Sequence, residues 1–225
     1  LVGSEMCIRD RAPLGSRTKL TLPDGTLVWL NAGSRITYSQ GFGVGNRKIE
    51  LIGEGYFEVK RNEEVPFLVK TNSLLVKVLG TKFNFRDYPD DAEAIVSLSE
   101  GKVALNNLLK KEKEAFLLPN ERVVLNKKNG RMHVEYSTVS NALQWTNGYL
   151  FFDEELLPDV VKELERSYNV KIQIASDTLN TFRFYGNFVH REQNIQEVLE
   201  ALSATRKIHY IIAVSYTHLR AHETS

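Results

Sequence analysis

The stretch from Lys19 to Tyr38, KLTLPDGTLVWLNAGSRITY, constrains the fold most. Pro23, Asp24 and Gly25 lie between two apolar runs. Each suits a tight turn, because proline presets φ, aspartate bonds the nearby backbone and glycine accepts a positive φ. Apolar residues alternate on both sides of the turn, which is typical of paired strands. The run LVWL after the turn is apolar at every position, and we predict a β-hairpin with a buried second arm.

Similar patterns continue to about Tyr136. Short alternating segments separated by turn residues occur at 48–60, 67–70, 74–86, 94–105, 116–125 and 131–136. Gly53 and Gly55 interrupt the first segment and indicate a bulge or a close backbone approach. About ten strands at regular spacing predict an all-β domain, as a sandwich, a roll or a solenoid-like stack. We place this domain at residues 12–137.

After Ser137 the period changes to that of helices. One apolar stripe runs from Leu156 to Tyr168 in steps of four. A second begins at Ile195, after Asn194 and with Glu197 three residues beyond that asparagine, close to a capping box. We therefore predict two amphipathic helices.

The region from Trp145 onward contains an internal repeat. A shift of 38 residues, the separation of Leu157 from Ile195, superimposes Gly148 on Gly186 and aligns the two apolar stripes. Alternating runs at 170–174, 182–188 and 208–212 predict strands. The repeat thus predicts a small α/β domain at residues 145–213, of order β-α-β-β-α-β with helices on one face. Trp145 is expected at or beside the domain junction.

The two ends look foreign to this pattern. Residues 1–11, LVGSEMCIRDR, and 214–225, VSYTHLRAHETS, fit neither strand nor helix periodicity and resemble translated sequencing-adapter read-through. We expect them to be non-native tails on an internal fragment of a longer protein.

Composition excludes some classes of function. Lys and Arg number 29 against 28 Asp and Glu, so the net charge of +1 gives no reason to expect nucleic acid as a partner. The only cysteine, Cys7, excludes a disulfide framework and a thiolate metal site. No apolar run approaches the roughly 20 residues that span a bilayer.

No set of residues predicts catalysis, a cofactor or a metal. His133, His190 and His209 are scattered and lack the spacing of metal ligands. Glycines at 41, 43 and 45 precede no helix that would hold phosphate. The acidic residues in the segment 87–93 lack the EF-hand pattern, and we expect a solvated turn there.

Several phrases in fixed order resemble the periplasmic part of FecR-family anti-sigma factors. They are LPDGTLVWLNAGS (22–34), LIGEGYFEV (51–59), PFLVKT (66–71), VKVLGTKFNFRDYPD (76–90), SEGKVAL (99–105) and LLPNERVVL (117–125). The segment 145–213 is similar to the short signalling domains at the N-termini of secretins and TonB-dependent transducers.

The resemblance implies the periplasmic region of a single-pass inner-membrane protein. Such a protein senses the signalling domain of an outer-membrane TonB-dependent receptor and controls a sigma factor through a cytoplasmic region that this chain lacks. The family brings no catalytic residues and no cofactor. The membrane anchor is likewise expected outside this chain.

Strand addition to a sheet edge is the expected mode of partner contact, because an edge presents unpaired backbone donors and acceptors. We expect the edge at 208–213 or at 182–188. The candidate partner-binding residues are Phe182, Phe184, Phe188, Ile208, Tyr210 and Ile212. A periplasmic glycan-binding β-domain is the alternative. It needs exposed aromatic residues with polar neighbours on one face, and it weakens if Trp29 and Trp145 are both buried.

Overall fold

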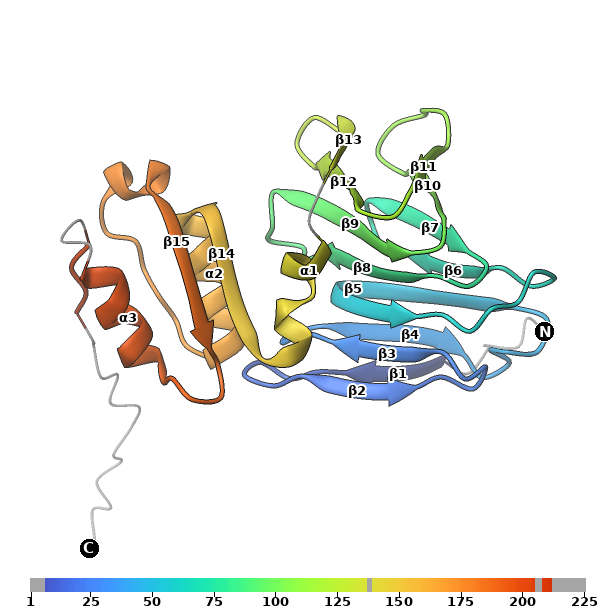
Figure 1. Cartoon of the computed structure of the whole chain (residues 1–225), viewed down its shortest axis with the longest axis horizontal. Coiled ribbons are helices and arrows are strands. Elements are labelled where there is room, and N and C mark those ends of the chain that lie inside the picture. The colour runs from blue at the N-terminus through green and yellow to red at the C-terminus, as the bar shows by residue number, and fades with distance from the viewer. Residues whose placement is uncertain (1–6, 137–138, 205–207, 212–225) are drawn as a thin grey trace, which may run out of the picture.

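The computed structural model describes residues 7–136, 139–204 and 208–211. Its larger part is a β-domain in which thirteen strands form one continuous sheet (Figure 1). The strands are β1 (Cys7–Arg11), β2 (Thr18–Thr21), β3 (Leu27–Leu30), β4 (Arg35–Ser39), β5 (Arg47–Glu58), β6 (Phe67–Lys70), β7 (Leu74–Val78), β8 (Lys82–Asp87), β9 (Glu93–Glu100), β10 (Val103–Asn107), β11 (Ala115–Leu117), β12 (Glu121–Asn126) and β13 (Met132–Tyr136).

The long strand β5 joins two layers of this sheet. Its first half pairs with β4 and, in parallel, with β6, whereas its second half pairs with β3 and β8. One layer therefore continues from β6 through β7 and β10 to β11, and the other continues from β8 through β9 and β12 to β13. The sheet folds over its own core at β5, and the predicted all-β domain is confirmed at this level.

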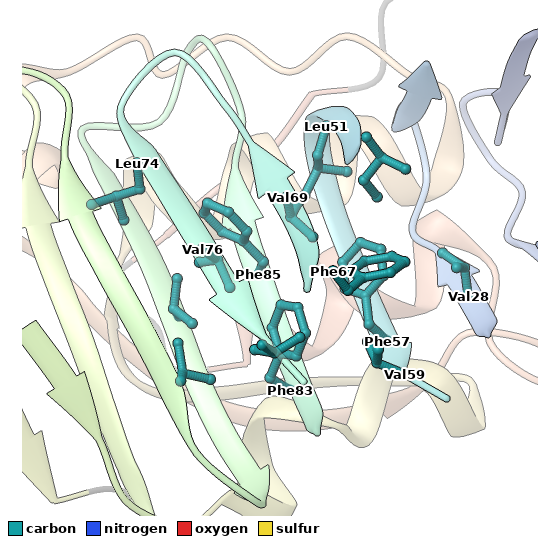
Figure 2. Close-up of a cluster of buried hydrophobic side chains, with 14 of the residues drawn as sticks. Val28, Leu51, Phe57, Val59, Phe67, Val69, Leu74, Val76, Phe83 and Phe85 are labelled. Carbon is teal, nitrogen blue, oxygen red and sulfur yellow. The ribbon is translucent and has the colours of Figure 1, made fainter. Parts of the chain in front are cut away.

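Aromatic side chains fill the space between the layers (Figure 2). The Phe57 ring lies 6.2 Å from the Phe67 ring of the other layer and stacks on Phe83 at 5.1 Å. All three are fully buried. Burying such a side chain is worth about 1.5–3 kcal/mol, so this cluster is a main source of stability.

The predicted hairpin is present. Strands β2 and β3 pair antiparallel from Thr18 opposite Leu30 to Thr21 opposite Leu27. The Gly25 N–H donates to Leu22 O at 2.8 Å and Gly25 has a φ of 86°, as the turn requires. Of the second arm, Val28 and Leu30 are fully buried.

Gly53 in β5 marks the predicted close approach of two backbones. It has a φ of 100°, and a Cβ there would lie 2.4 Å from Ser34 Oγ and 2.9 Å from the Ser34 Cα. Only glycine fits this position.

The N-terminal segment contains a strand that its sequence pattern did not predict. Cys7–Arg11 forms β1 and pairs antiparallel with β4. Most of its side chains are exposed, so backbone hydrogen bonds rather than apolar burial hold it. Pairing at a sheet edge requires little of the sequence. Residues 1–6 and 214–225 lie outside the described residues, and the non-native origin of both tails stays a prediction.

The C-terminal part is smaller and lies beside the β-domain (Figure 1). A short connection, α1 (Val139–Ala142) and a 3-10 turn η1 (Gln144–Asn147), leads into it. It contains β14 (Tyr149–Leu156), α2 (Leu157–Tyr168), a 3-10 turn η2 (Asp177–Thr181), β15 (Arg183–Val189) and α3 (Ile195–Ser203). Strands β14 and β15 pair antiparallel, and their buried face packs with both helices.

Both helices agree with the sequence predictions. Helix α2 has Pro158 in its first turn, where its missing N–H costs nothing. Asn194 and Glu197 form a complete capping box at the start of α3.

The order β-α-β-β-α-β is not reproduced, because residues 170–176 and 208–211 contain no strand. The Ile172 N–H donates to the side-chain Oε1 of Glu165 at 2.8 Å instead of to a neighbouring strand. Ser203 Oγ likewise donates to Ile208 O at 3.0 Å. Side chains of both segments still pack on the core. The apolar pattern therefore reflects side-chain burial, without the backbone hydrogen bonds of a β-ladder.

Candidate functional site

The described residues contain no group of three His, Cys, Asp or Glu side chains that could hold a metal ion. No helix in the described ranges is long and apolar enough to cross a membrane.

The structure places most predicted partner-binding side chains inside the second domain. Phe184, Phe188 and Ile208 are buried in its core, and Phe182 packs against that core. Tyr210 is half-buried, and Ile212 lies outside the described residues. These side chains therefore stabilise the domain, and what β15 can offer a partner is its backbone edge and its opposite face.

That opposite face has an aromatic residue that sequence reasoning missed. Tyr185 is 60% exposed, and Arg183 and Asn187 beside it are exposed as well. The alternation along β15 was a sufficient signal, because positions between buried phenylalanines must point outward.

Ion pairs join the two domains. Arg86 of β8 places Nη1 3.3 Å from Oε2 of Glu163 in α2, and its Nε donates to Asp91 at 2.9 Å. Arg166, one turn after Glu163, donates from Nη1 to Asp91 Oδ1 at 3.0 Å. The same arginine contacts Glu163 at 3.3 Å, which closes a four-membered network. We call Arg86, Asp91, Glu163 and Arg166 the interdomain ion network.

Tyr88 supports this network from the β-domain side. The Arg166 guanidinium lies 3.9 Å from the centre of its ring, a cation–π contact. The Tyr88 hydroxyl donates to Ala32 O at 2.8 Å and accepts from Ser34 Oγ at 3.1 Å. These two hydrogen bonds hold the Tyr88 ring in position against the Arg166 guanidinium.

A second set of buried polar groups reaches the junction. Both carboxylate oxygens of Glu54 accept hydrogen bonds, from Asn31 at 2.9 Å and from Asn84 at 2.8 Å. The Trp145 indole N–H donates to Asn84 Oδ1 at 3.1 Å. Trp145 is buried at the junction, as predicted.

The pKa values follow from burial and partners. Burial raises the pKa of Glu54, against the effect of Arg86 at 4.0 Å. Burial also opposes ionisation of Asp91 and Glu163, but the two arginines outweigh it and lower both pKa values. The network is thus most favourable with these two carboxylates ionised.

The expectation of a solvated acidic turn at 87–93 is wrong for two of its residues. Asp91 is buried between the two arginines, and Asp87 is buried against Lys127 at 2.6 Å. Asp90 and Glu93 are exposed. Asp91 pairs with a residue 75 positions away, and spacing within the turn carries no sign of that.

The two tryptophans that test the glycan-binding alternative differ in how exposed they are. Trp145 is 7% exposed and its polar atom is used internally. Trp29 is half-buried, with the Lys19 amine 4.5 Å from its ring centre. Only Trp145 is buried, so the glycan-binding alternative stays open.

Comparisons with known proteins agree with this architecture. The family described as "FecR protein" matches residues 11–104, and the one described as "FecR, C-terminal" matches residues 149–215. No curated protein matches the chain. Two crystal structures of a candidate anti-sigma factor from Parabacteroides distasonis ATCC 8503 are similar, both with a TM-score of 0.84. Their identities are 33% and 32%; each covers 92% of this chain, and the matches span 96% and 95% of those chains.

The two family matches fall on the β-domain and on the small β-α domain respectively. The chain belongs to the FecR family of anti-sigma factors. The family is regulatory, and its general partner is a sigma factor.

Proposed function

We propose that this chain is the periplasmic sensor region of a transmembrane anti-sigma regulator. It relays the state of an outer-membrane TonB-dependent receptor to a sigma factor by protein–protein contact. The observation that carries this proposal is the edge of β15 around Asn187, which no strand of the described residues covers. It belongs to a small domain that buried ion pairs join to the β-domain.

The geometry of β15 suits strand addition. Among the described residues β15 pairs only with β14. At the end of this ladder the His190 N–H donates to Gly148 O at 2.9 Å. Hydrogen-bonding direction alternates along an antiparallel strand, so the Asn187 N–H points away from β14. An extended segment of the receptor's signalling domain can pair there and lie against Tyr185.

Helix α2 connects this edge to the β-domain. Its apolar side, with Val160 and Leu164 fully buried, packs with the core under β14 and β15. Glu163 and Arg166 of the same helix bind the β-domain. A partner that binds β15 therefore contacts a strand packed on α2, and α2 is also bound to the β-domain.

The sigma-binding region and the membrane anchor are the remaining parts of the proposed pathway. The family resemblance assigns the sigma-binding region to the cytoplasm and the anchor to the inner membrane. The present chain supplies the receptor contact and the connection between the two periplasmic domains.

A calorimetric titration of this chain against the signalling domain of the TonB-dependent receptor encoded beside it tests the proposal. We expect saturable binding. Asn187→Pro removes the outward N–H and should weaken binding about tenfold or more, whereas Asn187→Ala keeps it and should bind within about twofold. Circular dichroism checks that both variants fold. Absence of binding by the unmodified chain contradicts receptor contact, and equal binding by both variants contradicts contact through this edge.

A further inference from the structure

A cavity of about 410 Å³ lies where the two domains meet. The N-terminal loop at 15–19 and Trp29 form one side, and Trp145, Thr146 and Gly148 of the junction form another. Ser167, His190 and Arg191 close it from the second domain. The volume falls in the range of about 300–1,000 Å³ that is typical of small-molecule sites.

The ionisable lining is entirely basic. Arg17, Lys19, His190 and Arg191 line the cavity, and no carboxylate of the described chain lies among the lining residues. The chain as a whole is nearly neutral, with 29 basic and 28 acidic residues, so this excess is local. Glu192 and Glu197 line an adjoining hollow instead, where Glu197 is engaged by the Asn194 N–H at 2.7 Å.

Arg17 has unused hydrogen-bonding capacity here. Its Nε donates to Asn31 Oδ1 at 3.1 Å, but its Nη2 is buried and has no hydrogen-bond partner in the described structure. A buried donor without an acceptor is unfavourable. This nitrogen is closed off from solvent, so an oxyanion in the cavity removes that cost only after the Arg17 side chain shifts toward it. The carboxylates that attract Arg17 electrostatically, Glu54 and Glu163, belong to the buried groups at the domain junction.

Arg191 adds a second guanidinium. It is exposed and forms no ion pair with any described carboxylate, and the same holds for Lys19. Burial lowers the pKa of Arg17, and Arg191 lowers it further by repulsion. Two guanidinium groups at one cavity, with no carboxylate among its described lining residues, favour an anion between them.

We propose that this cavity binds a small molecule bearing a carboxylate or a phosphate, held by Arg17 and Arg191 with Trp29 in the wall. Guanidinium groups match the geometry of these oxyanions and bind them with charge-assisted hydrogen bonds. The ligand touches both domains and so favours the arrangement in which they are joined. The site is distinct from the β15 edge and stands without it.

Tryptophan fluorescence provides the assay, because both tryptophans of the chain line the cavity. The probes are glucuronate, inorganic phosphate and, as the neutral match of the first, glucose. We expect saturable quenching or enhancement with glucuronate or phosphate and none with glucose. Glucuronate binding alone identifies an organic acid site, and phosphate binding alone identifies a phosphate site. Absence of binding by both anions at millimolar concentration overturns the proposal.

Variants locate the site. Arg191→Gln alters an exposed side chain and should weaken binding of the active probe about tenfold. Arg131→Gln, an exposed arginine in the turn between β12 and β13, is the matched control and should bind within about twofold. Arg17→Lys keeps the charge but loses the planar fork, and it should weaken binding as well. Equal affinity of the Arg191 and Arg131 variants overturns the assignment, and so does glucose binding as tight as glucuronate.

Discussion

Arg166 of α2 and Asp91, which follows β8, meet across the domain junction with Nη1 and Oδ1 3.0 Å apart. Both side chains are 8% exposed, so the pair is shielded from water. Arg86 and Glu163 complete the network on either side. The contact between domains is therefore electrostatic at its centre, and its strength depends on every member being present.

Removal of Arg166 is expected to be costly. Arg166→Ala leaves Asp91 and Glu163 with only one of their two arginines, and breaking a buried network of this kind costs about 3–5 kcal/mol. Urea unfolding measures the loss. Lys162→Ala on the same helix is the control: the side chains of Lys162 and its partner Asp159 are 26% and 32% exposed, so water screens this pair more than the network and the change should stay below about 1 kcal/mol. Equal effects of the two substitutions would contradict a stabilising network.

Acid should weaken the fold through the same residues. The lowered pKa values of Asp91 and Glu163 stabilise the folded state above their ordinary values of 3.8 and 4.5, and this stabilisation is lost as pH falls below them. The raised pKa of Glu54 acts in the opposite direction and favours the folded state at low pH. Urea unfolding between pH 7 and pH 3 should show a falling free energy, and Glu54→Gln should steepen the fall. A free energy that rises on acidification would contradict this assignment.

The Trp145 indole N–H gives a smaller, local prediction. Trp145→Phe leaves Asn84 Oδ1 without its donor in a buried position and should cost about 1–3 kcal/mol. Trp29→Phe removes an indole from a half-buried site and serves as the comparison. Thermal unfolding should rank Trp145→Phe as the less stable variant, and the reverse order would be inconsistent with the junction described above.

The hairpin turn has a structural role beyond its backbone. Asp24 accepts from Arg47 Nη1 at 3.2 Å, and Arg47 is 3% exposed. Asp24→Ala therefore leaves a buried guanidinium without its counterion and should destabilise the β-domain by about 3–5 kcal/mol. Arg61→Ala disrupts only the exposed pair with Glu63 and should change stability by less than about 1 kcal/mol. Calorimetric unfolding of the two variants distinguishes these effects.

Sequence patterns correctly predicted the features that depend on residues close together in the chain. Turn residues located the hairpin at Pro23–Gly25, and helical spacing with Asn194 and Glu197 located α3 and its cap. The glycine at position 53 indicated a bulge or a close backbone approach, and the structure shows the approach, to Ser34. Each of these features depends on residues within a few positions of one another or on a steric rule for one residue type.

Contacts between residues far apart in the sequence could not be predicted in this way. The interdomain ion network pairs residues 75 and 77 positions apart. No pattern within either segment indicates which distant residue it pairs with. At 170–174 apolar alternation predicted a strand, but the Ile172 N–H uses the Glu165 side chain and the segment packs without a ladder. Alternation reports which side chains are buried, and pairing depends on a neighbour that the pattern does not identify.

Hydrogen exchange of β15, with and without the receptor's signalling domain, tests the central claim most directly. The account predicts that the outward amide of Asn187 exchanges readily in the free chain and is protected in the complex, together with slower exchange in α2. Protection confined to the β-domain, with β15 unchanged under saturating conditions, would contradict receptor contact through this edge.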